Sequence, residues 1–261
     1  MSRVPAGSPG HAATHLHEEQ TLDTRHGRGL LVVIPALNEA DSIGRVVEAA
    51  IAQLGASVVV IDDGSSDDTA AVATAAGAVV LRHPFNLGVG GAIRTGLRWA
   101  AELGYAPVLQ VDGDGQHPPS QGKLLLDRLD EGDVDIVVGS RFNAGYEVSR
   151  TRRSAMRVLS RMISKRLGVQ INDTTSGFRA FGPRAIAELH ECYPSTYLSD
   201  TVEALLLAAD RGLRVAEVDV QMNPREHGRP SSGRIRSTIY LLRIILVVLM
   251  DRFREPHQRR R

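Results

Sequence analysis

Short apolar runs alternate with stretches of helical periodicity between residues 30 and 138, and this alternation constrains the fold more than any other feature. Five runs have the length and composition of buried strands, at 30–34, 58–61, 78–81, 107–111 and 136–138. Apolar residues at helical spacing fill the intervals between them. The pattern predicts an α/β fold, with a mostly parallel sheet and helices on both faces. Such sheets bind ligands at the carboxyl ends of their strands, so polar residues there are candidate site residues.

The boundaries of the first strand and helix carry explicit signals. We expect Pro35 to end the strand, and Asn38 or Asp41 to cap the helix that follows. After residue 150 the pattern changes. It predicts a basic amphipathic helix over 150–167, a polar turn over 173–179, a helix over 198–211 and an edge strand over 213–220.

Two aspartates directly follow the strand predicted at 107–111. Asp112 and Asp114 are separated by one glycine, and Gln116 lies two residues further on. Carboxylates this close repel each other unless a cation lies between them. Mg²⁺ or Mn²⁺ suits such a pair, because these ions take one or two carboxylates and complete their coordination with substrate phosphates. The alternative is a solvated Asp-Gly turn that binds nothing.

Polar turns also follow the strands predicted at 58–61 and 78–81. Asp62 and Asp63 could accept hydrogen bonds from a nucleotide base or from ribose hydroxyls, while Ser65, Ser66 or Asp67 caps the next helix. The glycine-rich stretch 86–91 resembles a dinucleotide fingerprint, but Ile93 stands where the third glycine would be. A Rossmann dehydrogenase is therefore disfavoured.

Six motifs in order along residues 30–236 together resemble family 2 glycosyltransferases of the GT-A fold. The nearest subgroup is that of the dolichol-phosphate mannose and polyprenyl-phosphate hexose synthases. The motifs are 34–39 (IPALNE), 62–65 (DDGS), 86–92 (NLGVGGA), 112–117 (DGDGQH), 139–142 (GSRF) and 175–179 (TSGFR). The resemblance implies an inverting, metal-dependent transfer of a hexose to a polyprenyl or dolichyl phosphate. The donor would be a nucleotide-diphosphate sugar of the GDP-mannose or UDP-glucose type.

The resemblance also implies roles for individual residues. Asp112, Asp114 and Gln116 would hold Mg²⁺ or Mn²⁺. The acceptor phosphate would meet Arg141, Arg225, Arg229 and Ser232. The nucleotide sugar would be bound by Pro35, Leu37, Asn38, Glu39, Asp62, Asp63, Gly64, Asn86, Gly88, Arg94 and Gly113.

The chemistry of the acceptor decides whether a base is needed. A phosphate monoester is already anionic, so it needs no general base, only cations that hold it in line, and arginine suits phosphate; the catalytic residues would then be Asp112, Asp114 and Arg141. A sugar, lipid or protein hydroxyl requires a carboxylate base, for which Asp200 and Glu203 are candidates. Asp200 heads a predicted helix, so its structural alternative is an N-cap. A non-catalytic nucleotide-binding scaffold is the remaining alternative.

Charge and cysteine content bear on location and partners. The 261 residues carry a net charge of +1, but ten arginines and three acidic residues lie between Arg225 and Arg261. This basic end indicates an anionic surface. The apolar run 244–250 is too short to span a bilayer, which favours a helix in the membrane interface or against a small membrane-protein partner over one packed on the core. Cys192 is the only cysteine, so we expect a reducing compartment and no internal disulfide.

These observations divide the chain into four parts. Residues 1–28 lack the apolar segment of a signal peptide and are predicted to be a disordered leader. A GT-A domain follows over 29–222, then a basic acceptor loop over 223–236 and an amphipathic helix with a basic tail over 237–261. We expect a cytoplasmic protein, peripheral at the inner face of the membrane, without a nucleic-acid partner and possible as a homo-oligomer.

Overall fold

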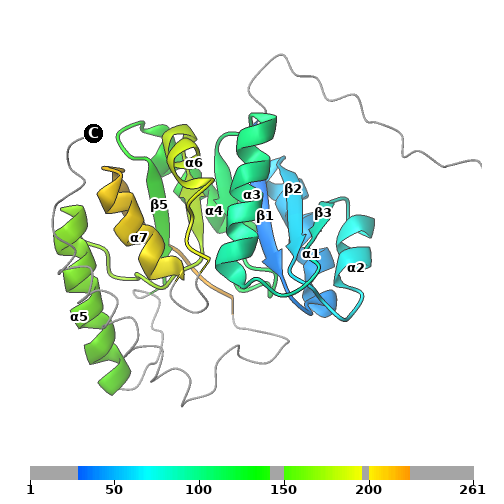
Figure 1. Ribbon diagram of the computed structural model, residues 1–261, viewed down its shortest axis with the longest axis horizontal. Coiled ribbons are helices and arrows are strands. Elements are labelled where there is room, and N and C mark those ends of the chain that lie inside the picture. Colours follow the sequence, from blue (N-terminus) through cyan, green and yellow to red (C-terminus); the bar gives the residue numbers. More distant parts are fainter. Residues whose placement is uncertain (1–28, 142–149, 196–199, 224–261) are drawn as a thin grey trace, which may run out of the picture.

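The structure, a computed structural model, describes residues 29–141, 150–195 and 200–223, and within them one seven-stranded sheet has helices on both faces (Figure 1). The strands are β1 (Leu31–Ala36), β2 (Ser57–Asp62), β3 (Val79–Arg82), β4 (Val108–Gln110), β5 (Ile136–Ser140), β6 (Arg179–Phe181) and β7 (Val215–Asp219). The helices are α1 (Ala40–Leu54), α2 (Thr69–Ala75), α3 (Val89–Leu103), α4 (Pro119–Asp130), α5 (Arg150–Leu167), α6 (Pro183–Leu189) and α7 (Asp200–Asp210). The predicted leader, nearly all of the predicted acceptor loop and the C-terminal helix lie outside the described residues.

The strand order is β3-β2-β1-β4-β6-β5-β7, and every strand except β6 runs in the same direction. The mostly parallel α/β sheet is thus confirmed, and the edge strand predicted over 213–220 is found as β7. β6 was not predicted, because the sequence pattern indicated only a polar turn there. Its antiparallel insertion places the 173–179 segment, which enters β6, between the carboxyl ends of β4 and β5.

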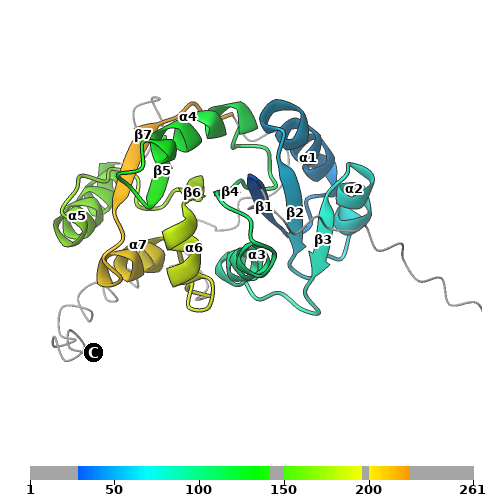
Figure 2. The same ribbon diagram turned by 90° about the horizontal axis from the view of Figure 1, so that it is seen from above.

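Each face of the sheet has its own apolar core. Helices α1, α2 and α4 cover one face, and α3, α6 and α7 cover the other (Figure 2). Alternate residues of one strand serve the two cores: Val32 and Ile34 face α1, while Leu31 and Val33 face α3. Helix α5, predicted over the same residues, packs Leu159 and Ile163 into the second core beside α7. Among the described residues, no helix is both long and apolar enough to cross a lipid bilayer.

The prediction that Pro35 ends the first strand is wrong. β1 continues through Pro35 to Ala36, which pairs with Asp62 of β2. The carbonyl oxygen of Val33 accepts a hydrogen bond from Val111 on the β4 side, so Pro35, two residues on, faces the same side past the end of β4. A proline is tolerated there because no partner strand needs its missing N–H.

The predicted caps of α1 are also wrong. Glu39 is the N-cap residue and makes no side-chain capping bond, while Asn38 adopts a left-handed conformation with φ of 56°. The amide groups at the helix start are satisfied from the next loop instead: Glu39 N donates to Thr69 Oγ1 and Ala40 N to Asp67 Oδ2. Hydrogen bonds therefore hold the 38–40 and 65–69 loops together.

Candidate functional site

The loops that follow β1, β2, β4 and β5 meet at one edge of the sheet, because these strands are parallel. This edge, with the loop after β3, gathers the described residues that the sequence analysis assigned to a site, except Arg94, which lies within α3, and Asp200 and Glu203, which lie in α7. Arg225, Arg229 and Ser232 lie outside the described residues.

The Asp112 loop follows β4 and is held in shape by hydrogen bonds between its own backbone amides and side chains. Asp112 N donates to His117 Nδ1 at 3.1 Å, and the His117 ring is buried and stacks on Phe178 with centroids 4.8 Å apart. Asp114 Oδ1 accepts a hydrogen bond from Gln116 N at 3.0 Å. This turn fixes the relative positions of the predicted ligands, while the Asp112 carboxylate keeps 38% of its surface exposed.

Ser42 of α1 ties this loop to the loop after β1. Its hydroxyl donates to Gly113 O at 2.7 Å, and it also lies 3.2 Å from Glu39 Oε2. Ser42 is only 4% exposed. The predicted nucleotide loop and the predicted metal loop are thus joined through one buried hydroxyl.

The 173–179 segment touches both the Asp112 carboxylate and Arg141. A Cβ atom added at Gly177 would lie 3.1 Å from Asp112 Oδ1 and 3.4 Å from Oδ2, so a glycine permits this close approach. Arg141 follows β5; its Nε lies 3.0 Å from Asp173 Oδ2, and its Nη2 donates to Thr175 Oγ1 at 3.1 Å. Asp173 is fully buried, whereas the Arg141 side chain is 26% exposed. Asp173 and Thr175 therefore hold the guanidinium from the protein side, while part of the Arg141 side chain stays accessible to solvent.

Asp62 and Asp63 are buried and bonded within the protein. Asp62 accepts a hydrogen bond from Ser65 N and pairs with Arg82 Nε at 2.9 Å. Asp63 accepts hydrogen bonds from Leu87 N and Gly88 N, each at 2.8 Å, and lies 2.7 Å from His83 Nδ1. In this structure both carboxylates shape the loops at this edge, and the exposed residues near them include Leu37, Asn38 and Asn86.

Helix α3 begins at Val89, and its first turn lies close to α7. A Cβ atom at Gly90 would lie 2.1 Å from Pro194 O and 2.8 Å from Asp200 Cβ, so only glycine fits. Arg94, on the next turn of α3, donates from Nε to Tyr193 O at 2.7 Å and from Nη2 to Ser195 Oγ at 3.1 Å. Arg94 therefore anchors the segment that leads towards Asp200.

Asp200 lies in a buried charge cluster behind the Asp112 loop. Burial raises the pKa of Asp200 to about 6; the positive charge of Arg179 opposes this rise and the negative charge of Asp112 adds to it. Arg179 is 1% exposed and donates to the carbonyl oxygens of Ser176 and Thr201. Burial also raises the pKa of neighbouring Tyr193 to about 12, so its hydroxyl stays protonated.

The sequence analysis missed several residues that build this site. Ser42, His117, Asp173, Arg179 and Tyr193 were assigned no role, although Arg179 lies in a recognised motif. One signal was available for Arg179: a charged residue directly before the apolar pair Ala180-Phe181 must find buried partners. No local pattern marks Ser42, whose partner lies 71 residues away.

The oxygen-rich Asp112 loop suits a hard divalent cation. Asp112, Asp114 and Gln116 offer only oxygen ligands, the set that Mg²⁺ and Mn²⁺ prefer, and Gly177 leaves space beside the Asp112 carboxylate. The described residues contain no group of three or more His, Cys, Asp or Glu able to hold a metal ion. Asp112 and Asp114 could supply carboxylate ligands to a cation whose other coordination positions are filled by a phosphate-bearing substrate.

Comparison with known proteins gives a consistent result. The model of Glycosyl transferase family 2 matches residues 31–189. The chain is 30% identical to the undecaprenyl-phosphate mannosyltransferase of Micrococcus luteus, over 76% of this chain and 85% of that protein. It is 29% identical to the polyprenol monophosphomannose synthase of Mycolicibacterium smegmatis, over 85% of this chain and 88% of that protein.

A solved structure with a similar fold is glucosyl-3-phosphoglycerate synthase from Mycobacterium tuberculosis, in complex with Mn²⁺, UDP-glucose and phosphoglyceric acid. Its TM-score to this chain is 0.66, with 25% sequence identity over 88% of this chain and 82% of that one.

Proposed function

The chain belongs to glycosyl transferase family 2, and on that premise we propose that this glycosyltransferase moves a hexose from a nucleotide-diphosphate sugar to a polyprenyl phosphate. Two relatives named for transfer to polyprenyl acceptors support the acceptor class. The complex of a structural relative with UDP-glucose and Mn²⁺ supports the donor class and the cation. We propose UDP-glucose or GDP-mannose as the donor and inversion at the anomeric carbon.

One observation carries the proposal: the 173–179 segment lies against the Asp112 carboxylate and also holds Arg141. Gly177 abuts Asp112, and Asp173 and Thr175 bind the Arg141 guanidinium. A cation held by Asp112 and Asp114 would neutralise the donor diphosphate, and Arg141 would hold the acceptor phosphate nearby. Arginine suits this task because its planar donors match phosphate oxygens in pairs.

The donor would bind across the loops after β1 and β2, which hydrogen bonds hold together. Because the Asp62 and Asp63 carboxylates are engaged inside the protein, we expect their role to be indirect, through the shape of the Gly64 and Gly88 backbones. Leu37, Asn38 and Asn86 would make side-chain contacts from the exposed rim, with Pro35, Glu39 and Gly113 forming the floor. Arg94 would act by holding the 193–195 segment.

The reaction then needs no proton transfer from the acceptor. An oxygen of the acceptor phosphate attacks the anomeric carbon, and the bond from that carbon to the donor diphosphate breaks, leaving its electron pair on the diphosphate. A bound Mg²⁺ or Mn²⁺ supplies charge neutralisation to this leaving group. Arg141 keeps the attacking oxygen in line, and Asp112 and Asp114 orient the donor.

The direct experiment incubates the purified full chain with Mn²⁺, polyprenyl phosphate and labelled UDP-glucose or GDP-mannose. The expected result is one lipid-linked hexose for each nucleoside diphosphate released, with the anomeric configuration inverted. If no nucleotide sugar is turned over with any lipid phosphate, the proposed acceptor class is excluded.

The raised pKa of Asp200 favours a second candidate, transfer to a hydroxyl acceptor. A buried carboxylate with a pKa of about 6 is a suitable general base near neutral pH. Asp200→Asn separates the two candidates, since it would cripple transfer to a hydroxyl and leave transfer to a phosphate nearly unchanged. The close packing of Asp200 against Gly90 and the Arg179 cluster supports a structural role for Asp200 instead.

We propose a peripheral location at the cytoplasmic face of the membrane, where a lipid phosphate and a soluble nucleotide sugar can meet. Arg225, Arg229 and Ser232 would complete the acceptor site from the 223–236 loop, and the 237–261 segment would contact lipid or a small membrane protein. A truncation at residue 236 tests the role of the 237–261 segment: membrane recovery should fall, and an unchanged recovery would contradict that role.

A further inference from the structure

Helix α5 carries an exposed row of positive charge whose role the proposed reaction does not explain. Its sequence, RTRRSAMRVLSRMISKRL, contains seven basic residues and no acidic residue. Arg157, Arg161 and Lys165 recur every four residues, so they share one side of the helix, and all three are exposed. Met156, Leu159 and Ile163 occupy the opposite side and are buried in the fold.

These three cations differ from exposed cations on other helices. On α3 and α4, Arg98 pairs with Glu102 and Lys123 pairs with Asp127. Arg166 of α5 itself pairs with Asp210 of α7 at 2.6 Å. Within the described parts of the chain, by contrast, no carboxylate lies within salt-bridge distance of Arg157, Arg161 or Lys165. No carboxylate of the described residues therefore neutralises these three charges.

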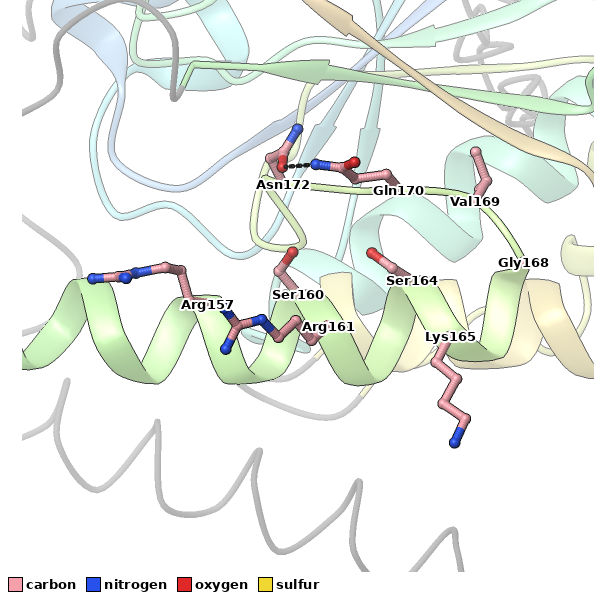
Figure 3. Close-up of a pocket in the computed structure, with 9 residues that line it drawn as sticks. All are labelled: Arg157, Ser160, Arg161, Ser164, Lys165, Gly168, Val169, Gln170 and Asn172. Atoms are coloured by element: carbon pink, nitrogen blue, oxygen red, sulfur yellow. Dashed lines mark hydrogen bonds between the residues drawn. The ribbon is translucent and has the colours of Figure 1, made fainter.

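A groove of about 610 Å³ runs between α5 and the 168–172 segment (Figure 3). Ser160 and Ser164 point from the helix towards that segment and donate hydrogen bonds to Ile171 O, which closes the floor. Gln170 and Asn172 form the far wall and are hydrogen-bonded to each other at 3.1 Å. None of the nine residues that line the groove is acidic. Arg157 and Arg161 therefore present positive charge along the edge of this groove, while the Lys165 side chain extends from the side of the helix away from the 168–172 segment (Figure 3).

Apolar side chains are interleaved with these cations. Val158 is 46% exposed and Val169 is 36% exposed, and the α5 sequence contains no aromatic residue. Nucleic-acid surfaces usually provide aromatic residues for base stacking. Long side chains with a cationic end, placed beside aliphatic residues, are instead typical of helices that lie in the headgroup layer of an anionic bilayer.

We propose that the surface formed by Arg157, Val158, Arg161, Lys165 and Val169, called here the α5 face, docks the enzyme onto anionic phospholipid, with a headgroup phosphate in the groove. The position of the groove agrees with the proposed reaction. Asn172 lines it, and the next residue, Asp173, holds Arg141 at 3.0 Å. Docking through this surface would bring Arg141 close to the membrane plane, where a polyprenyl phosphate presents its charge. This last step rests on the proposed function; the docking itself does not.

Flotation of the full-length protein with vesicles tests the docking. The vesicles are phosphatidylcholine alone or phosphatidylcholine mixed with phosphatidylglycerol. The α5 variant combines Arg157→Gln, Arg161→Gln and Lys165→Gln. The control removes the same number of charges from other helices, by Arg45→Gln, Arg98→Gln and Lys123→Gln. Each cation at an anionic surface strengthens partitioning roughly fivefold, so the α5 variant should lose on the order of 100-fold in affinity for the mixed vesicles.

The expected result is this loss in the α5 variant only, with the control binding like the wild type and inorganic phosphate failing to displace the vesicles. Equal binding by wild type and α5 variant, or equal losses in both variants, would overturn the proposal. So would binding of a single-stranded RNA that depends on the α5 face while vesicle binding does not.

A second measurement separates this inference from the proposed function. Transfer to a short-chain acceptor phosphate in free solution should be the same in the wild type and the α5 variant. If the wild type fails that reaction but still floats through the α5 face, the function is wrong and the docking surface stands. If the α5 variant loses the solution reaction as well, the α5 face is part of the active site and the docking proposal fails.

Discussion

The hydroxyl of Ser42 donates a 2.7 Å hydrogen bond to the carbonyl oxygen of Gly113, so helix α1 is tied directly to the loop that carries Asp112 and Asp114. Both partners are buried. The same hydroxyl lies 3.2 Å from the carboxylate of Glu39, in the loop that we expect to contact the nucleotide. In the proposed reaction, the positions of the donor and of the cation would therefore be coupled through Ser42.

Ser42→Ala should lower the free energy of unfolding by about 1–3 kcal/mol, because a buried carbonyl oxygen loses its partner. The Mn²⁺ concentration for half-maximal activity should rise at the same time, since the Asp112 loop is released. Ser42→Thr keeps the hydroxyl and should restore the metal dependence. A variant that is destabilised but has unchanged metal dependence would reduce Ser42 to a purely structural role.

Asp114→Asn should reduce transfer by on the order of 100-fold or more, because a neutral amide cannot balance a cation as a carboxylate does. Circular dichroism should remain that of the wild type, since Asp114 lies half-exposed in a loop. The matched control is Asp127→Asn on the exposed side of α4. Excess EDTA should stop the wild-type reaction and Mn²⁺ should restore it; full activity in EDTA would contradict the metal role.

Asp173→Asn should weaken acceptor binding more than donor binding. Arg141 would lose the carboxylate that lies 3.0 Å from its Nε, so its guanidinium would sample more orientations. We expect KM for polyprenyl phosphate to rise about tenfold, equivalent to about 1.4 kcal/mol, with a smaller change for the nucleotide sugar. Steady-state kinetics with each substrate varied in turn measures this. An equal rise in both KM values would show that the variant disturbs the whole site.

The pH dependence of stability should report on Asp200. Its pKa is raised to about 6 in the folded protein and returns to about 4 in the unfolded chain. Between these values the folded state retains a proton that the unfolded state has released, so stability falls as pH rises, by about 3 kcal/mol in total. Asp200→Asn should remove this fall in urea unfolding between about pH 4 and pH 7, whereas Asp130→Asn on exposed α4 should not.

Much of the order of helices and strands was predictable because β1, β2, β4 and β5 are short, mainly apolar runs that are almost entirely buried. β6 escaped prediction because only three residues form it, and one of them is Arg179. Its place in the sheet depends on backbone pairing with β4 and β5, which no local pattern encodes. The end of β1 was missed for a related reason: Pro35 is tolerated only because β4 stops short of it.

In the candidate site, too, some features follow from local sequence and others depend on tertiary contacts. The placement of Asp112, Asp114 and Arg141 at one edge of the sheet was predictable because each follows an apolar run, whereas their expected roles came from the family resemblance. The burial of Asp62 and Asp63 was not, because their partners Arg82, His83 and Gly88 come from the neighbouring strand and loop. Local sequence identifies polar residues at a strand end, but only tertiary contacts decide whether their side chains face a ligand or the protein.

The central claim is that Arg141, braced by the 173–179 segment beside Asp112, receives an acceptor phosphate. The most direct measurement compares transfer to polyprenyl phosphate and to the phosphate-free polyprenol, in the wild type and in Arg141→Gln, with Arg128→Gln on α4 as the control. The account predicts that the wild type uses only the phosphate, and that KM for it rises on the order of 10- to 100-fold in Arg141→Gln alone. Equal use of polyprenol by the wild type, or unchanged kinetics in Arg141→Gln, would contradict it.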